Sequence, residues 1–231
     1  SETQVSYAAE DAVHLAEVYV RLRPQLSDDK YAWVLEDGAE LVANLRREVD
    51  PYEVYRDAKL AWKLSRAQLA VLRELCAWRE QQARARDLPR NRIIREHSLW
   101  PLAKSQPDNL AALGKIEDMH PRTVRQDGQF LLDLIKRAGS VSMDQWPPAV
   151  AEPLPVDAAV LIKQLRALGQ AEAERLEMAP ELMLRKKTLE ALVKSGYPDG
   201  PYTLPDSLRG WRRELMGQAL LDSLATAGEQ P

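Results

Sequence analysis

Apolar residues recur at spacings of three and four along almost the whole chain, and this spacing limits its fold more than any other feature. Residues three and four apart share one face of an α-helix, so the pattern gives each helix an apolar side to bury. No stretch shows the sustained alternation of apolar and polar residues that a half-buried strand requires. The sequence therefore predicts an all-α protein, with helices over residues 3–23, 28–47, 65–86, 91–97, 98–104, 108–114, 121–137, 156–176, 180–186, 188–195 and 205–225.

Proline residues mark the boundaries between groups of helices. Pro51 stops the second predicted helix, and four further prolines fall between residues 140 and 155. A run with so many prolines cannot continue a helix and tends to stay extended, which is typical of a linker. We therefore predict helical segments over 1–50, 51–139 and 156–231, with a linker over 140–155.

The helices before and after this linker resemble each other at a constant offset of 90 residues. The segment from Ile93 to Ser105 matches the segment from Met183 to Ser195 without a gap. Chance similarity between two amphipathic stretches rich in Leu and Ala is the alternative. A pattern shared over several elements favours duplication, so we predict that residues 156–231 form a second, diverged copy of the preceding module.

The charge of the chain is unevenly distributed. The formal net charge is −3, but residues 1–50 carry −6, residues 51–139 carry +6 and residues 140–231 carry −3. The middle third is therefore the candidate for contact with phosphate groups.

Other sequence features exclude several classes of protein. No apolar run approaches the length of a membrane span, and no secretion signal is visible, so we expect a cytoplasmic protein without a membrane partner. The single cysteine, Cys76, falls in an apolar pattern and is predicted to be a buried small hydrophobic residue. His14, His97 and His120 are scattered without ligand spacing, so no zinc site is predicted.

The middle third resembles a known nucleic-acid-binding domain. The run from Leu69 to Glu80, followed by Leu88-Pro89-Arg90-Asn91 and Ile93-Ile94-Arg95, is similar to the HRDC domain. That domain occurs in RecQ-type helicases and in ribonuclease D. The resemblance covers residues 55–139 strongly and residues 155–225 more weakly, and it implies tandem small helical bundles that bind nucleic acid.

Six arginines in this region are candidates for RNA contact. They fall on and just after the helix predicted over 65–86, at Arg79, Arg84, Arg86, Arg90, Arg92 and Arg95. A guanidinium is a planar fork of donors that suits phosphate oxygens, and neighbouring guanidiniums raise the local potential where an RNA backbone could pass. The alternative is a solvated face whose arginines form internal ion pairs with Asp87 and Glu96.

Tyr7 and Asp11 fit the Tyr-x-x-x-Asp motif of the DEDD exonucleases that use tyrosine. Residues four apart on a helix share a face, so both side chains can point into one site. The resemblance implies that Asp11 ligates a divalent metal, Mg²⁺ or Mn²⁺, and that Tyr7 orients the attacking water in the intact enzyme. The alternative is a surface aspartate beside a core-facing tyrosine. A RecQ helicase would have a winged-helix region at this position, so the motif favours ribonuclease D.

Intact enzymes of this kind need an Asp-x-Glu motif on a strand and a second aspartate motif upstream of Tyr-x-x-x-Asp, and this sequence has neither. We therefore expect the C-terminal part of a ribonuclease D, in which the terminal helices of an otherwise missing α/β exonuclease domain precede tandem HRDC-like bundles. The implied parent is a 3′-5′ exoribonuclease that trims the 3′ ends of structured RNA such as tRNA precursors. The chain alone is expected to be inactive and to hold no metal. A stand-alone nucleic-acid-binding module and a helical protein-interaction scaffold are the alternatives, and the oligomeric state stays open.

Overall fold

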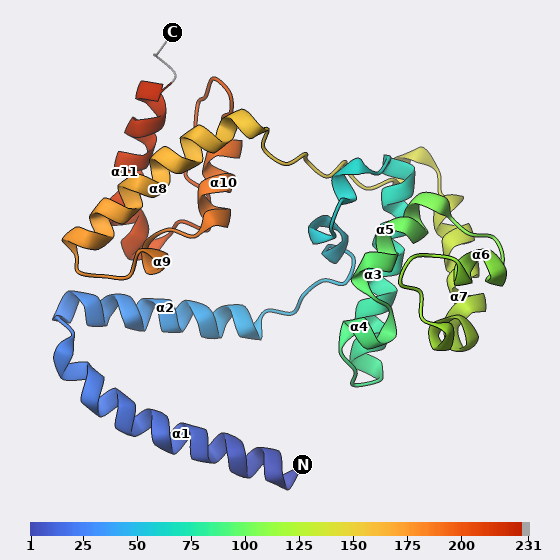
Figure 1. Ribbon diagram of the computed structural model, residues 1–231, viewed down its shortest axis with the longest axis horizontal. Coiled ribbons are helices and arrows are strands. Elements are labelled where there is room, and N and C mark those ends of the chain that lie inside the picture. Colours follow the sequence, from blue (N-terminus) through green and yellow to red (C-terminus); the bar gives the residue numbers. More distant parts are fainter. Residues whose placement is uncertain (228–231) are drawn as a thin grey trace. The chain divides into compact units, whose positions relative to one another are not determined.

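The computed structural model describes residues 1–227 and contains helices but no strands over them, so the all-α prediction is confirmed for this part of the chain. The chain divides into two compact units (Figure 1). One is Glu48–Pro153, called the first module below; the other joins the N-terminal arm, Ser1–Arg47, to the second module, which starts at Leu154. Of the predicted segment 156–231, residues 228–231 lie outside the described residues. No helix within residues 1–227 is long and apolar enough to cross a membrane.

The first module is built around one long helix, α3. Its helices are α3 (Arg66–Ala85), α4 (Arg90–Ile93), α5 (Glu96–Ser105), α6 (Leu110–Gly114) and α7 (Pro121–Gly139), preceded by two short 3-10 helices, Val54–Asp57 and Ala61–Lys63. α3 begins at a capping box, in which the Ser65 hydroxyl accepts from the Gln68 backbone N–H and the Gln68 side chain accepts from the Ser65 N–H. It packs against α4, α5 and α7.

The core of the first module lies along the apolar side of α3. Leu69, Leu72 and Leu75 are fully buried there, as their three-residue spacing predicts. Cys76 is also buried, and burial raises the pKa of its thiol to about 12, so it is a packing residue and not a nucleophile at neutral pH. Trp78 packs against the ring of Phe130 on α7, with the ring centroids 6.0 Å apart.

The predicted linker is partly packed onto the first module. The Arg66 guanidinium donates to the backbone oxygens of Trp146 and Pro147, each at 3.0 Å. The Trp146 indole donates to the backbone oxygen of Val141 at 3.2 Å, and Pro147 is buried. These contacts fix the first part of the proline-rich segment, which was predicted to be an extended linker.

The second module repeats the order of helices found in the first, except that α6 has no counterpart among the described residues. Its helices are α8 (Ala159–Arg175), α9 (Pro180–Met183), α10 (Lys186–Lys194) and α11 (Gly210–Ala227), and α8 packs against the other three. The turn after the long helix corresponds in detail. Asp87 and Glu177, 90 residues apart in the sequence, both have positive φ, at 49° and 50°.

The turn that follows is closed by the same backbone hydrogen bond in both modules. In the first module the Leu88 backbone N–H donates to the Ala83 backbone oxygen at 3.0 Å. In the second module the Met178 N–H donates to the Ala173 oxygen at 2.9 Å. The two modules therefore share local geometry as well as sequence pattern.

The N-terminal arm consists of α1 (Glu2–Leu22) and α2 (Asp28–Arg46), joined by a short 3-10 turn, Arg23–Gln25. α1 begins at a capping box formed by Ser1 and Gln4. The two helices are linked where the hydroxyls of Tyr19 and Tyr31 are 2.8 Å apart. α1 has no buried residue in the described structure, and its apolar side faces outward.

Candidate nucleic-acid interface

The turn between α3 and α4 turns a run of arginines toward one side of the first module. After α3 ends at Ala85, the left-handed residue Asp87 reverses the chain and Pro89 leads into α4. Ile93 and Ile94 are buried and anchor this segment in the core. Because these two residues point inward, their neighbours Arg92 and Arg95 remain exposed.

The start of α7 lies against this segment and completes a groove. The buried Thr123 hydroxyl donates to the backbone oxygen of Ile93 at 3.0 Å, which joins α7 to α4. The space between them is a groove of about 970 Å³, called the arginine groove below. Its walls are formed by Arg86, Leu88, Pro89, Asn91, Arg92, Ile93, Ile94, Arg95, His120, Arg122, Thr123, Gln126 and Asp127.

Arg79 does not belong to this surface, which corrects its selection as an RNA contact. Its side chain is buried. There it donates to the Asn91 side-chain oxygen at 2.7 Å and to the Arg90 backbone oxygen at 3.3 Å. Burial lowers the pKa of this guanidinium from its ordinary value. Arg79 therefore links α3 to α4 and supports the groove from behind.

Arg84 and Arg90 lie outside the groove and pair with one buried carboxylate. Arg84 contacts Glu80 at 3.1 Å and donates to the backbone oxygen of Val49 at 2.9 Å, and Arg90 forms an ion pair with the other Glu80 oxygen. Burial opposes ionisation of Glu80, but the hydrogen bonds and charges of Arg90 and Arg84 outweigh it and lower the pKa of this carboxyl. Much of the positive charge of these two arginines is therefore balanced internally.

Arg86 and Arg95 line the groove, each with an acidic partner. Arg86 donates to both oxygens of Asp127, at 2.6 and 3.0 Å, and its third nitrogen donates to Gln82 at 2.9 Å. The hydrogen bonds that Arg86 donates to Asp127 raise the pKa of this guanidinium. Arg95 pairs with Asp118 at 2.9 Å, and this pair is exposed to solvent. Internal ion pairs do exist, as the alternative interpretation held, but within residues 1–227 none of them joins the cluster to Asp87 or Glu96.

Arg92 is the predicted arginine that is most available for a ligand. Within the described residues its exposed side chain forms no hydrogen bond or ion pair.

Two groove residues, Arg122 and His120, were not predicted from the sequence. Arg122 donates to Gln126 at 3.2 Å, and the Nδ1 atom of His120 accepts from the Arg122 backbone N–H at 3.1 Å, which caps α7. The sequence signal that was available is the His-Pro-Arg start of a long helix.

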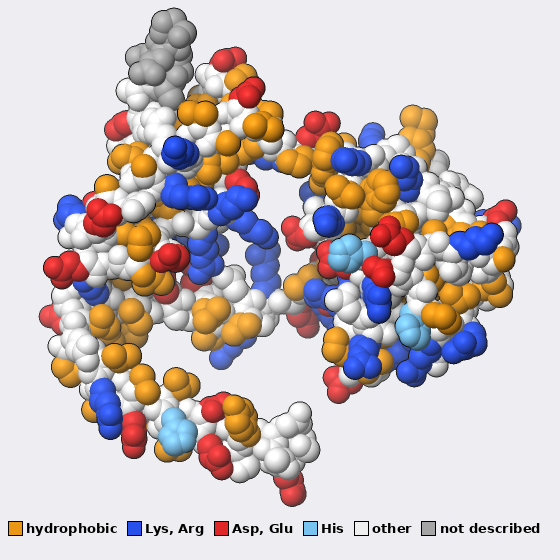
Figure 2. Space-filling model, in the orientation of Figure 1, with side chains coloured by type: hydrophobic (Ala, Val, Ile, Leu, Met, Phe, Trp, Pro, Cys, Tyr) orange, Lys and Arg blue, Asp and Glu red, His pale blue; other side chains and the backbone are white. Residues whose placement is uncertain are grey.

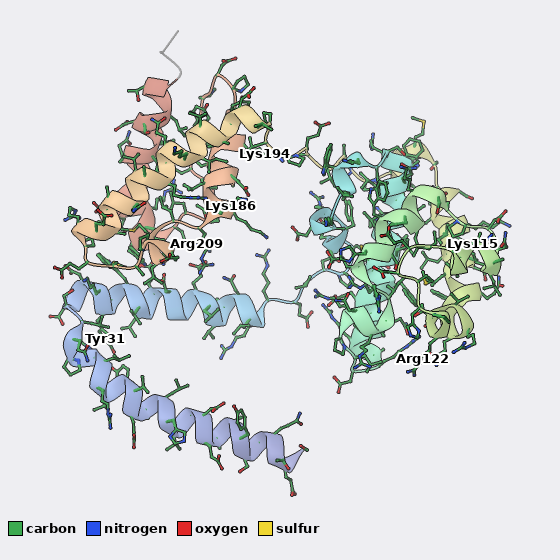
Figure 3. All side chains as sticks on the ribbon, viewed as in Figure 1. Tyr31, Lys115, Arg122, Lys186, Lys194 and Arg209 are labelled. Carbon is green, nitrogen blue, oxygen red and sulfur yellow. The ribbon has the colours of Figure 1, made fainter. Side chains whose placement is uncertain are left out.

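The groove is positively charged and has little aromatic surface. Four arginines and one aspartate line it, and His120 is its only aromatic-ring residue among those described. Figure 2 shows Lys and Arg side chains gathered at the end of the first module where Figure 3 labels Arg122. Such a surface suits phosphate oxygens better than unstacked bases, because base stacking needs aromatic side chains.

Tyr7 and Asp11 lie in the other unit, on α1. They are four residues apart on one helix, and Tyr7 is 67% exposed, so it does not face a core within the described structure. Residues 1–227 contain no group of three or more His, Cys, Asp or Glu side chains arranged to hold a metal ion. The single carboxylate of Asp11 does not by itself form a divalent metal site, which requires several oxygen ligands.

Comparison with known proteins extends the resemblance to the HRDC domain and to ribonuclease D. Residues 68–135, which include all four groove arginines, match the HRDC domain. Ribonuclease D of Pseudomonas paraeruginosa is 64% identical over 227 residues, covering 98% of this chain and 60% of that protein. Ribonuclease D of Cronobacter turicensis is 31% identical, covering 95% of this chain and 60% of that protein.

A solved structure gives the same result for the fold. The crystal structure of Escherichia coli RNase D, described as an exoribonuclease involved in structured RNA processing, matches with a TM-score of 0.81 at 28% identity. The match covers 98% of this chain and 61% of that protein. The chain thus spans about three-fifths of the length of the proteins it resembles.

Proposed function

We propose that this chain acts as the RNA-binding part of a ribonuclease D-type 3′-5′ exoribonuclease, and that the arginine groove of the first module holds the RNA backbone. The observation that carries the proposal is the groove itself, in which Arg86, Arg92, Arg95 and Arg122 converge from two helical segments. The similarity to ribonuclease D over 98% of the chain supports the enzyme class. The substrates would be the 3′ ends of structured RNA, with tRNA precursors as the specific candidates.

The groove would recognise the shape and charge of a backbone and not a base sequence. A guanidinium can form two parallel hydrogen bonds to one phosphate, and Arg92 and Arg122 have donors left for this purpose. Contacts to phosphate position a nucleic acid without reading its bases. The expected ligand is therefore any RNA whose backbone can lie along the groove.

The test is replacement of Arg92 and Arg122 by Ala together, with filter binding to a tRNA at several salt concentrations. Each lost phosphate contact should lower the slope of log affinity against log salt by about 0.7 to 0.9, so the double variant should lose nearly twice that amount. Lys115→Ala with Lys136→Ala is the matched control, since it removes two exposed charges of the same module outside the groove. Equal slopes in the two double variants would reject the groove as the RNA site.

We further propose that α1 contributes Tyr7 and Asp11 to the active site of an exonuclease domain, where Asp11 would be one of several ligands for Mg²⁺ or Mn²⁺. With one carboxylate available, the chain alone is proposed to be inactive. The outward apolar side of α1 supports this role. Tyr7, Leu15 and Val18 lie on the same face of α1 as Asp11 and are 67%, 65% and 47% exposed, and such a surface is typical of one that packs against a partner. A stand-alone nucleic-acid-binding protein would share the groove but give no reason for this surface.

A further inference from the structure

The second module has a face that corresponds to the arginine groove, but its residues are different. At the offset of 90, Leu88, Pro89 and Arg92 correspond to Met178, Ala179 and Leu182. The first turns of α7 and α11 correspond at an offset of 89, which places Trp211 where the first module has Arg122. Two arginines that could bind phosphate are thus replaced by large apolar residues.

This face of the second module lies against α2. A cavity of about 660 Å³ remains between them, and both sides contribute to its walls. Met178, Ala179, Leu182 and Trp211 come from the second module, and Leu22, Leu26, Lys30, Trp33, Val34 and Asp37 are among the residues from the arm.

The centre of the contact is a pair of tryptophans. The rings of Trp33 and Trp211 are stacked, with centroids 4.7 Å apart and planes 13° apart. The Trp211 indole N–H donates to Asp37 at 3.1 Å, so one aromatic residue binds α2 through both its face and its edge.

Acidic residues of α2 complete the contact by pairing with cations of the second module. The Arg212 guanidinium donates to both oxygens of Asp37, at 2.5 and 2.8 Å. One turn further along α2, Glu40 pairs with Arg209 at 3.4 Å; Figure 3 labels Arg209. The face therefore provides an aromatic platform beside a bidentate cation, which suits an acidic amphipathic helix.

We infer that the two modules have divided two tasks between corresponding faces: the first binds RNA, and the second is a docking site for the acidic helix α2. The second module holds the N-terminal arm and does not contact RNA through this face. The inference rests on the proposed function only in assigning RNA to the first module. The docking of α2 depends on contacts within one unit and stands independently.

The experiment compares full-length chains by hydrogen exchange and by filter binding to a tRNA. Trp33→Ala and Asp37→Asn should each lower the amide protection of residues 28–46 about tenfold or more, because docked helices exchange only after they detach. RNA affinity and the protection of residues 66–139 should stay within about twofold, because the groove is untouched. Leu45→Ala and Asp29→Asn are the matched controls, since they remove an apolar and an acidic side chain from exposed positions of the same helix.

Two results would overturn the inference. The first is unchanged protection of α2 in both test variants, because the contact would then not hold the arm. The second is RNA binding that becomes several-fold tighter in Asp37→Asn and returns to normal when Trp211→Ala is added, which would identify a masked RNA site. If Trp33→Ala also lowers the amide protection of α8 and α11, the second module itself is disturbed. The test then depends on the conservative Asp37→Asn variant alone. Failure of the proposed function would look different from both results. In that case, replacing Arg92 and Arg122 by Ala would leave the RNA affinity of the chain unchanged.

Discussion

Asp127 limits the positive charge of the arginine groove at the scale of a single residue. It is the one acidic residue among the described residues that line the groove, and it holds the guanidinium of Arg86 with two hydrogen bonds. A phosphate that approached Arg86 in the same bidentate way would have to displace this carboxylate. In the proposed RNA complex, Asp127 would therefore compete with a phosphate for the donors of Arg86.

We predict that Asp127→Asn strengthens RNA binding. The amide keeps the shape of the side chain but removes a negative charge from the groove and frees Arg86. The slope of log affinity against log salt should steepen by about 0.7 to 0.9, which corresponds to one more phosphate contact. Filter binding to a tRNA over a range of salt concentrations measures this slope.

Asp133→Asn is the control for Asp127→Asn. Asp133 is also on α7 and exposed, but it bonds to Gln129 and does not line the groove. Asp133→Asn removes the same charge from the same helix but leaves Arg86 paired with Asp127. It should therefore change the RNA affinity much less. Equal gains in both variants would indicate a general charge effect and not release of Arg86.

The partners of the arginines show where residue-level prediction from sequence stops. The cluster itself could be predicted, because the arginines are close in sequence. Which of them are free could not, because Arg86 pairs with a residue 41 positions away and Arg95 with one 23 positions away. Burial of Arg79 likewise depends on how α4 folds back, which periodicity alone does not specify.

At the scale of helices, long amphipathic patterns were predictable and short connections were not. α3 and α7 fall within two residues of their predicted bounds. The predicted helix over 91–97 is wrong, because Ile94 is extended with φ −151° and separates α4 from α5. The helix predicted from residue 205 begins at Gly210, a residue with positive φ. Ile94 is buried in the core of the first module, and Gly210 lies against Glu36 of α2. Tertiary contacts therefore determine where these two helices break or begin.

The docking of α2 should depend on pH through Asp37. The hydrogen bond from Arg212, followed by that from Trp211, lowers the pKa of this carboxyl from its ordinary value despite partial burial. A lowered pKa in the docked state means that ionised Asp37 stabilises docking at neutral pH. That contribution is present above the ordinary value of about 3.9 and is lost as the pH falls through the lowered value.

We therefore predict that α2 detaches more readily in acid. Amide protection of residues 28–46 should fall between about pH 4 and the lowered pKa, while the protection of α8 should fall less. In the Asp37→Asn chain the same protection should already be low at pH 7 and change little in this range. Wild-type protection that stayed constant throughout would show that Asp37 does not contribute to docking.

At the scale of the whole molecule, the proposed catalytic role of α1 can be tested in a ribonuclease D that carries the exonuclease domain. Asp11→Asn should abolish activity, because a metal ligand is lost. Tyr7→Phe should lower kcat by about 10- to 100-fold, the range seen when a group that orients reacting ligands is removed. Both variants should retain wild-type affinity for RNA, since neither residue is part of the arginine groove.

Rates and affinities must be measured together to interpret these variants. Full turnover by Asp11→Asn at saturating Mg²⁺ would reject the assignment of the metal ligand. A loss of RNA affinity equal to the loss of rate in Tyr7→Phe would instead indicate a binding role for that hydroxyl. Arg92→Ala in the same enzyme serves as the reference for a pure binding defect.

The grouping of the arm with the second module is a whole-molecule property that the sequence did not indicate. The charge and proline patterns separated residues 1–50 from 156–231, and both patterns are local. The contact that joins them pairs Trp33 with Trp211 and Asp37 with Arg212, more than 170 positions apart in the numbering. Neither partner is unusual in its own helix, so only the folded structure brings them together.

This long separation has a consequence for how the protein is made. The hydrogen bond between Trp211 and Asp37 spans 174 residues, with the entire first module between its ends. During synthesis α2 leaves the ribosome before α11 does, so Trp33 on α2 stays uncovered until Trp211 has been made. A message that terminates early, after residue 153 but before Trp211, would yield a chain that still has its arginine groove yet cannot anchor α2.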